Sequence, residues 1–293
     1  MHTPLSRRDL LRNAALAAAA LVLPADPDHQ RLAAWAGALR AEGLSRPGAP
    51  LGRAATRVGK LAAGTPYVPA TLEAYLRAGG SPSGTEPLTL SLTRFDCVTL
   101  VESCLAVARA AAGEGAPSWE RFAREIERMR YRGGERRGYS SRLHYFSEWI
   151  ADGEKRGIVR SLGAELGGVE DLRPLRFMTE HRGSYPALAD ASVFREIAAM
   201  EQRLDERPRR VVPTDRIPDV ASRIESGDVL AFATAVPGLD VSHAAFAYRG
   251  GDGMLRVLHA PLSGGVVEIA RATLPEYVAA IRRSTGIMIA RPQ

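Results

Sequence analysis

Long apolar runs, dense basic tracts and cysteines are all scarce in this sequence of 293 residues. No run after residue 30 approaches the roughly 18 apolar residues that a membrane-spanning helix needs, so we expect a soluble mature protein without stable membrane insertion. The formal charge is +6 and aromatic residues make up 6%. Because no Lys/Arg tract concentrates that charge, nothing favours nucleic acid binding. The remaining composition is that of an ordinary globular chain, long enough to bury a good core.

The first 25 residues differ from the rest. Paired arginines at positions 7 and 8 precede an Ala/Leu/Val stretch at 14–23, and a small residue follows at Ala25. A basic start, a short apolar stretch and a small residue are typical of a secretory signal, and the paired arginines resemble a twin-arginine signal. We therefore expect residues 1–25 to be a signal peptide and the protein to be periplasmic. An uncleaved anchor helix is the alternative.

The chain has only two cysteines, Cys97 and Cys104. An oxidising compartment would favour a disulfide, but seven positions on a helix correspond to ~10 Å of rise. That exceeds the ~7 Å limit between the Cα atoms of bridged cysteines. If the segment is helical, at least one thiol is therefore free for another purpose.

Helical and alternating apolar patterns divide the chain into a helical first half and a strand-rich end. We predict an α+β fold in residues 26–293, one domain whose N-terminal helices pack on a C-terminal antiparallel sheet. A segment at about 115–213 is interpreted as an inserted lobe. The predicted helices are 28–42, 52–63, 96–112, 119–130, 143–157 and 274–282; the predicted strands are 88–92, 228–234, 243–248, 254–260 and 266–269; residues 193–204 fit either.

Cys97 has the strongest indication of chemistry. It lies in the first turn of a predicted helix, where Thr93 and Asp96 resemble a capping box. Unpaired N–H groups at a helix start stabilise a thiolate and can also hold an oxyanion. Cys97 is therefore a candidate nucleophile, whereas Cys104 fits the apolar face of the same helix.

A base for that thiol is offered by His243 and His259, on the two strands that flank the Gly-Gly-Asp-Gly loop. With a four-residue turn, His243 faces Ala260 and His259 faces Ala244. A one-residue bulge would place the two histidines opposite each other. One imidazole can then take the thiol proton while the second orients it. A zinc site built from one cysteine and two histidines is the rival interpretation, but it lacks the usual close-spaced ligand pair.

Weaker candidates surround these three residues. Tyr67 follows a Gly-Thr-Pro turn and could donate to an oxyanion. We take a further set as candidate substrate-binding residues, although a cap, a turn or a solvated face explains each of them as well. These residues are Asp96, Ser141, Arg142, His144 and Asp240.

Four segments, 64–67, 92–102, 141–146 and 238–243, resemble the N-acetylmuramoyl-L-alanine amidase-like family of the NlpC-type papain-like cysteine peptidases. The most specific is Phe-Asp-Cys-Val-Thr-Leu-Val-Glu at 95–102, and the resemblance spans roughly residues 55–290. It implies a papain-like fold, a triad of Cys97, His243 and His259, and Tyr67 near the oxyanion. No cofactor or metal is implied.

The resemblance also implies the substrate. Members cleave the bond between the muramyl lactyl group and L-Ala, with a preference for anhydro-muropeptides, so the expected partners are muropeptide and peptidoglycan fragments. A D-Glu–diamino acid endopeptidase is the first alternative, but Val98-Thr99 replaces the Ser-Gly typical of that branch. A catalytically inactive wall-binding module, whose Cys97 would not react with iodoacetamide at neutral pH, is the second. The oligomeric state is left open.

Overall fold

One antiparallel sheet organises the computed structural model, which describes residues 26–261 and 265–293, so the predicted signal lies outside the described part. The strands are β1 (Val159–Ser161), β2 (Val169–Asp171), β3 (Arg209–Pro213), β4 (Val229–Thr234), β5 (Val241–Arg249), β6 (Leu255–His259), β7 (Glu268–Thr273) and β8 (Ser284–Pro292). Their order is β2-β3-β8-β4-β5-β6-β7, with β1 also pairing with β8. The predicted combination of helices and an antiparallel sheet is confirmed.

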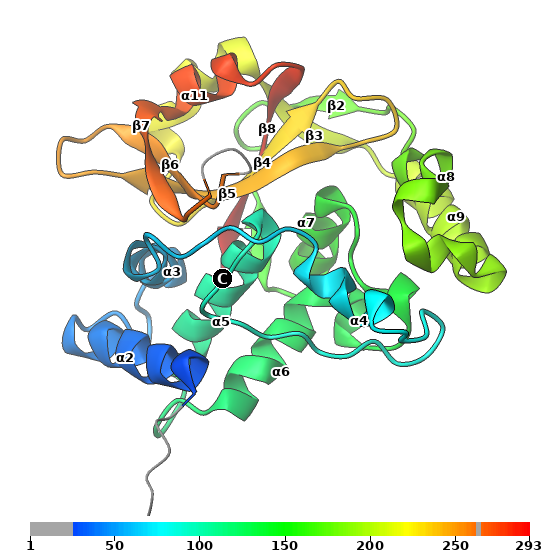
Figure 1. Cartoon of the computed structure of the whole chain (residues 1–293). Helices are drawn as coiled ribbons and strands as arrows, with labels where there is room; N and C mark the ends of the chain where they lie inside the picture. The colour runs from blue at the N-terminus through cyan, green and yellow to red at the C-terminus, as the bar shows by residue number, and fades with distance from the viewer. Residues whose placement is uncertain (1–25, 262–264) are drawn as a thin grey trace, which may run out of the picture.

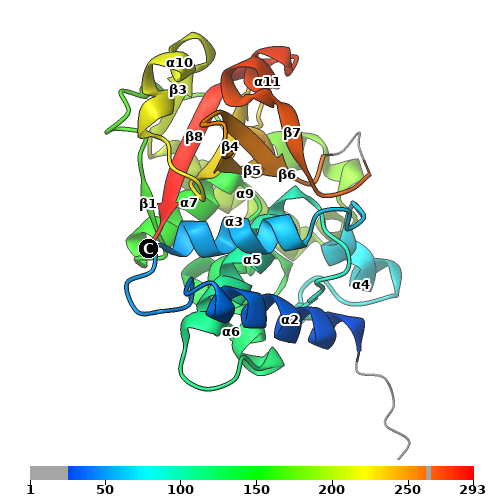
Figure 2. The same ribbon diagram turned by 90° about the vertical axis from the view of Figure 1, so that its left-hand side faces the viewer.

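Helices cover both faces of this sheet. They are α2 (Pro27–Ala41), α3 (Leu51–Leu61), α4 (Ala74–Arg77), α5 (Cys97–Ala112), α6 (Trp119–Arg130), α7 (Phe146–Lys155), α8 (Phe177–Glu180), α9 (Ala191–Asp205), α10 (Ile217–Val220) and α11 (Leu274–Ala280). Helices α2, α3, α5 and α6 lie on one side and α11 on the other (Figure 1). The turned view shows α3 between the sheet and α2 (Figure 2). None of the described helices has the length and apolar character of a membrane span.

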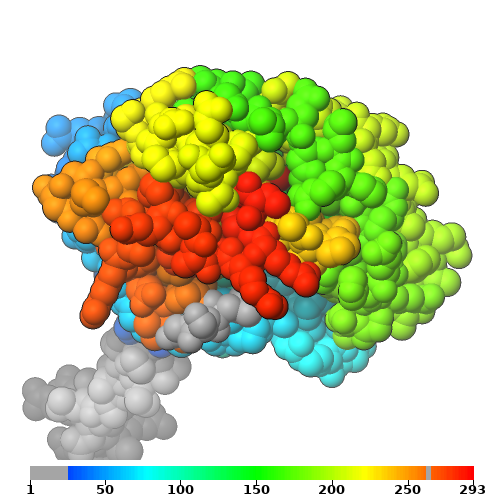
Figure 3. Space-filling view, turned by 90° about the horizontal axis from the view of Figure 1, so that it is seen from above, coloured from blue at the N-terminus to red at the C-terminus, as the bar shows by residue number. Residues whose placement is uncertain are grey.

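The strands bury alternate side chains in two separate cores, as the two-residue period of a strand requires. Ala244 and Phe246 of β5 pack with Leu105 of α5 in the first core. Ala245 packs with Leu274 of α11 in the second, whose outer surface is formed by α10, α11 and neighbouring residues (Figure 3). Each face of β5 therefore has its own helical cover.

Close packing of α3 on the sheet depends on a glycine. A Cβ atom at Gly59 would lie 2.6 Å from Cδ2 of Leu258 on β6, which is far inside normal contact distance. The absence of a side chain there lets the helix approach the strand directly. That approach brings the end of α3, and the loop after it, close to the hairpin.

One predicted strand is not observed, and four observed strands, β1, β2, β3 and β8, are absent from the prediction. The predicted strand at 88–92 is irregular, because the N–H of Leu92 donates to the Asp28 carboxylate at 2.7 Å and not to a neighbouring strand. Conversely, β8 was not predicted, although it lies in the middle of the sheet between β3 and β4. Its central residues, Ile287 to Ala290, are all buried, and a strand covered on both faces shows no alternation to detect.

Most other elements agree with the sequence. Helix α6 spans the predicted residues, and β4, β5 and β6 form the predicted strands. The ambiguous segment at 193–204 is helix α9, and β7 begins two residues later than expected. Helix α7 begins at Phe146 and not at residue 143, which leaves Leu143 and His144 outside the helix and in the neighbourhood of Cys97.

Side chains of the segment at 115–213 pack in three different hydrophobic clusters. Helices α6 and α7 contribute Phe122 and Trp149 to the first core, and Val212 of β3 joins the second. Tyr145 and residues of α9, such as Ile197, form a third cluster, which lies beside the sheet in Figure 1. The part of this segment that stands apart is therefore mainly the region of α8 and α9.

Candidate active site

Cys97 is the first residue of α5, and Asp96 is its N-cap. The Asp96 carboxylate accepts the N–H of Thr99 at 2.7 Å, and the N–H of Asp96 donates to the Thr99 hydroxyl at 2.8 Å. The capping box predicted between Thr93 and Asp96 is therefore wrong, because the box begins at Asp96. The Asp96 carboxylate that we had assigned to substrate binding serves the cap.

The pKa of the Cys97 thiol is raised, whereas its position at a helix N-terminus led us to expect a lowered pKa. Backbone N–H groups of Ala244, Val98 and Cys97 itself act to lower the pKa of the Cys97 thiol. Burial of the sulfur and, next in size, the Asp96 carboxylate outweigh them and raise that pKa to about 12. A helix N-terminus favours a thiolate only where solvent or cations compensate for desolvation. The resting sulfur is therefore a protonated thiol.

This raised pKa predicts the pH dependence of alkylation. Below its pKa a thiol gains thiolate about tenfold per pH unit, so we expect the rate of Cys97 alkylation by iodoacetamide to rise steadily between about pH 6 and 9. The measurement uses a Cys104→Ala protein, in which Cys97 is the only thiol. A rate that is constant across this range would instead show a thiolate already paired with an imidazolium.

The hairpin register differs from both predicted registers. The strands pair Phe246 with Leu258, because the loop between them has five residues and not four. Continuing this register places His259 opposite Ala245, which lies two residues beyond His243 on the same face. The histidines are therefore diagonal neighbours, and the small side chain of Ala245 leaves room for their rings to meet.

The two imidazoles form a hydrogen-bonded pair. His243 Nε2 lies 2.8 Å from His259 Nδ1, with the ring planes at 78°. The ring of Phe232 stacks on His243 at 10° and a centroid distance of 5.6 Å. Burial, and then the neighbouring His259, lowers the pKa of His243 to about 3, and burial lowers the pKa of His259 to about 4. Both rings are therefore neutral near pH 7, and Nε2 of His243 is engaged while Nδ1 remains available.

Tyr277 of α11 is a member of this group that the sequence did not indicate. Its hydroxyl lies 3.3 Å from His259 Nδ1, and its ring meets the His259 ring edge-on at 5.1 Å. Burial raises the pKa of Tyr277 to about 12, with Glu268 and Cys97 adding to the shift. The sequence predicted the closing helix that carries Tyr277, but only the packing of that helix shows which side chain reaches the histidines.

Tyr67 is held beside Cys97 by backbone pairing on both sides. The N–H of Tyr67 donates to the carbonyl of Gly265 at 2.7 Å, and the N–H of Val68 donates to the carbonyl of Phe95 at 2.8 Å. Burial raises the pKa of Tyr67 to about 12, and Cys97 is the next contributor. The phenol is therefore a neutral O–H donor near the sulfur.

A cavity of about 160 Å³ brings the nucleophile and base candidates together. Its lining is mainly apolar and comes from α5, the start of α7, and the loop that leads into β5. The lining residues are Cys97, Val98, Leu143, His144, Phe146, Leu239, Asp240, Val241, Ser242, His243 and Ala244.

Asp240 and His144 line this cavity, but both Asp240 carboxylate oxygens and Nε2 of His144 already have partners. The Asp240 carboxylate accepts the N–H of Ser147 at 2.8 Å and the N–H of Val241 at 2.6 Å, and its burial raises its pKa. His144 Nε2 lies 2.9 Å from the carbonyl oxygen of Tyr139. Asp240 therefore supports the loop that leads to His243 and has no bond to that ring.

Ser141 and Arg142 do not line the cavity. The Ser141 hydroxyl bonds within its own turn, to the carbonyl of Gly138 at 2.7 Å. Arg142 is buried, pairs with Glu73 and lies 3.5 Å from a Glu86 oxygen. The bonds of both residues support the fold outside this cavity, and their assignment to substrate binding stays a prediction.

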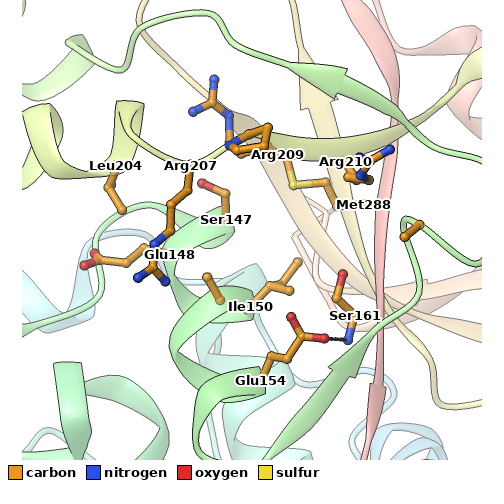
Figure 4. Close-up of a pocket in the computed structure, with 13 residues that line it drawn as sticks. Ser147, Glu148, Ile150, Glu154, Ser161, Leu204, Arg207, Arg209, Arg210 and Met288 are labelled. Atoms are coloured by element: carbon orange, nitrogen blue, oxygen red, sulfur yellow. Dashed lines mark hydrogen bonds between the residues drawn. The ribbon is translucent and has the colours of Figure 1, made fainter.

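A larger cavity of about 280 Å³ lies along α7 (Figure 4). Ile150, Leu204 and Met288 form part of its wall, and Arg207 points toward Glu148 across it. It contains none of the predicted catalytic residues. Within the described residues, no cluster of three or more His, Cys, Asp or Glu side chains is placed to hold a metal ion, and both cysteines are free.

Comparison with known proteins finds solved structures with the same fold. An N-acetylmuramoyl-L-alanine amidase from Bacteroides uniformis has a TM-score of 0.75 and 28% identity, over 83% of this chain and 99% of its own. A Bacteroides fragilis protein provisionally named a xylanase has a TM-score of 0.72 and 32% identity, over 80% of this chain and 98% of its own. A Legionella pneumophila protein, at 18% identity and a TM-score of 0.65 over 90% of this chain and 94% of its own, shares the fold. No curated protein sequence matches significantly.

The profile of the AmiA-like family, described as N-acetylmuramoyl-L-alanine amidase-like, matches residues 57–287. This range includes Tyr67, Cys97, both paired histidines and Tyr277. The resemblance noted in the sequence is thereby confirmed. The chain belongs to the AmiA-like family of N-acetylmuramoyl-L-alanine amidase-like proteins.

Proposed function

We propose that this protein is a periplasmic, cysteine-dependent amidase that cleaves the bond between the muramyl lactyl group and L-Ala in muropeptides. The observation that carries the proposal is that Cys97 and His243 both line one cavity, and that His259 is hydrogen-bonded to Nε2 of the His243 ring. This combination of nucleophile, base and orienting group is what thiol-mediated acyl transfer requires. We interpret the architecture as papain-like, of the NlpC type.

The proposed first step joins proton transfer to attack. Cys97 Sγ attacks the lactyl carbonyl carbon while its proton passes to His243 Nδ1. In this proposal the backbone N–H of Cys97 and the Tyr67 hydroxyl stabilise the oxyanion. When the tetrahedral intermediate collapses, the C–N bond breaks and His243 returns the proton to the leaving nitrogen of L-Ala. A thioester between Cys97 and the lactyl carbonyl remains.

The second step is hydrolysis of that thioester. His243 accepts a proton from water as the water oxygen attacks the thioester carbon, and the C–S bond breaks. The released thiolate regains the proton from His243. Because the pKa of Cys97 is about 12 and that of His243 about 3, the resting state is a neutral pair, and His243 acts as a general base during attack.

The size of the cavity indicates how the substrate binds. A volume of about 160 Å³ is smaller than the ~300–1,000 Å³ of typical ligand pockets. It therefore suits the groups beside the scissile bond, while the sugar and the rest of the peptide lie outside. We propose an anhydro-muropeptide as the preferred substrate, on the basis of the family resemblance alone.

Mass spectrometry of one muropeptide digest tests the proposed bond. We expect free peptide that begins with L-Ala, together with a muramyl sugar that has lost its whole peptide. A muramyl dipeptide among the products would instead show cleavage between D-Glu and the diamino acid. Parallel digests of anhydro and reducing muropeptides measure the preference for the sugar.

The xylanase name of one structural relative offers a second candidate reaction. Glycoside hydrolysis ordinarily needs two carboxyl groups that flank the bond. Among the described residues that line the cavity, Asp240 alone carries a carboxylate, and two backbone N–H groups occupy it. The site therefore favours amide hydrolysis. Release of xylo-oligosaccharides from xylan would overturn this preference.

A catalytically inactive wall-binding protein is distinguished by turnover and not by alkylation. The raised pKa of Cys97 also slows iodoacetamide labelling of an active enzyme at neutral pH, so weak labelling does not identify an inactive protein. Binding to peptidoglycan without any release of peptide would support the inactive alternative.

A further inference from the structure

His259 has two polar neighbours at a single ring nitrogen. His243 Nε2 lies 2.8 Å from His259 Nδ1, and the Tyr277 hydroxyl lies 3.3 Å from the same atom. In a neutral imidazole each nitrogen either donates or accepts. The tautomer of His259 therefore determines which nitrogen of His243 carries a proton, and with it whether His243 can accept one from Cys97.

The surroundings of Tyr277 favour an accepting Nδ1. The Tyr277 hydroxyl has one hydrogen-bond contact in the described structure, which is His259 Nδ1. A half-buried phenol at pH 7 keeps its proton, because the pKa of Tyr277 is raised. Donation to His259 Nδ1 is the only way for this O–H to reach a partner among the described residues, and Nδ1 then carries a lone pair.

The other ring nitrogen points to the same tautomer. His259 Nε2 is buried and has no hydrogen-bond partner among the described residues, where the Glu268 carboxylate lies 3.9 Å from it. A lone pair on Nε2 would face a negative oxygen, whereas an N–H there directs its positive end toward it. Glu268 thus favours a proton on Nε2, from the side of the ring opposite Tyr277.

We propose that Tyr277 and Glu268 are positioning residues that hold His259 as the Nε2–H tautomer. His259 Nδ1 then accepts a three-centre bond from His243 Nε2–H and the Tyr277 O–H. With its proton on Nε2, His243 presents an unprotonated Nδ1. The consequence for catalysis rests on the proposed function, because that lone pair is the one assigned to the Cys97 proton.

Three ionisable groups face His259 in this arrangement, and a fourth acts on one of them. His243 faces it from β5, Glu268 from β7 and Tyr277 from α11, and Cys97 acts on Tyr277 from the start of α5. With His243 and Tyr277 neutral and the thiol protonated at pH 7, the Glu268 carboxylate is the only charge among the four. A single carboxylate can therefore bias the tautomer.

The Tyr277→Phe substitution removes the hydroxyl and keeps the packing of the aromatic ring, so it tests the hydroxyl alone. The Tyr277 ring also contacts Phe232, at a centroid distance of 5.5 Å, and phenylalanine keeps that contact. Tyr248→Phe is the matched control, since Tyr248 lies at the far end of β5, against Lys60. Glu268→Ala is a second variant with little risk to folding, because the Glu268 side chain is 50% exposed.

Nitrogen-15 NMR of histidine-labelled protein reads the tautomer directly. His243→Gln and His259→Gln proteins assign the two rings. We expect the proton of His259 on Nε2 in the unaltered protein, and a measurable Nδ1–H population in Tyr277→Phe that increases in the Tyr277→Phe/Glu268→Ala double variant. A proton on Nδ1 of His259 in the unaltered protein, or tautomers unchanged in both variants, would overturn the proposal.

Kinetics tests the catalytic consequence. We expect Tyr277→Phe to lower kcat about three- to tenfold, the worth of one neutral hydrogen bond, with KM unchanged, and Tyr248→Phe to leave both unchanged. An equal kcat in Tyr277→Phe would remove the catalytic role. Absence of amidase activity in the unaltered protein would contradict the proposed function, and the NMR result would still decide the tautomer.

Discussion

Replacing Cys97 with alanine is expected to lower amidase turnover by about four to six orders of magnitude, because loss of the nucleophile removes the covalent route. The oxyanion donors and the substrate contacts remain, so binding should change little. The measurement is the rate of peptide release from purified muropeptides, with substrate affinity determined separately on the inactive variant.

Cys104→Ala is the matched control for this variant. Cys104 lies seven residues further along α5 and is buried in the first core, so its loss affects packing and leaves the cavity intact. We expect a lower Tm with kcat unchanged. Full peptide release by Cys97→Ala, or loss of activity only in Cys104→Ala, would rule out the cysteine mechanism.

Replacing Arg142 with alanine is expected to destabilise the fold by about 3–5 kcal/mol, the usual cost of leaving a buried charge unpaired. Glu86 is 1% exposed, and Arg142 lies 3.5 Å from one of its oxygens, while the same guanidinium pairs with Glu73. Arg142 also stacks over the ring of Tyr139 at 4.9 Å. This cluster joins the segment at 71–86, which includes α4, to the segment before α7, and so supports one wall of the cavity.

Thermal unfolding measures the Arg142 effect. For a chain of this size we expect Tm to fall by about 6–20 °C. Arg137→Ala is the control, since the Arg137 side chain is 77% exposed and pairs only with exposed Glu135, a pair of little value. An unchanged Tm combined with a raised KM in Arg142→Ala would return Arg142 to the substrate-binding role first assigned to it.

Local sequence patterns were sufficient for several parts of the site. Apolar spacing and residue type placed Cys97 in the first turn of a helix, and the Gly-rich loop identified the hairpin that carries His243 and His259. These features depend on residues that are near one another along the chain, through hydrogen bonds and turn geometry that act over a few positions. The same patterns failed for β8, because a strand with both faces covered looks like any short apolar run.

The hairpin register could not be obtained from the loop residues. Sequence permitted a four-residue turn or a bulge, and the observed five-residue loop follows neither. Register depends on which faces of the strands are buried by α3, α5 and α11, and those helices come from both ends of the chain. The diagonal meeting of the two imidazoles over Ala245 is a result of that packing.

Some chemical features of the site also follow from the sequence, and others follow only from the tertiary structure. The identity and order of Cys97, His243 and His259, and the family to which the chain belongs, follow from the amino-acid sequence, because they are local or read directly from residue type. The neutral state of the thiol, the position of the Tyr277 hydroxyl and the pairing of Arg142 follow from folding alone. Each depends on desolvation or on a contact between distant segments, and no short stretch of sequence contains the information for either.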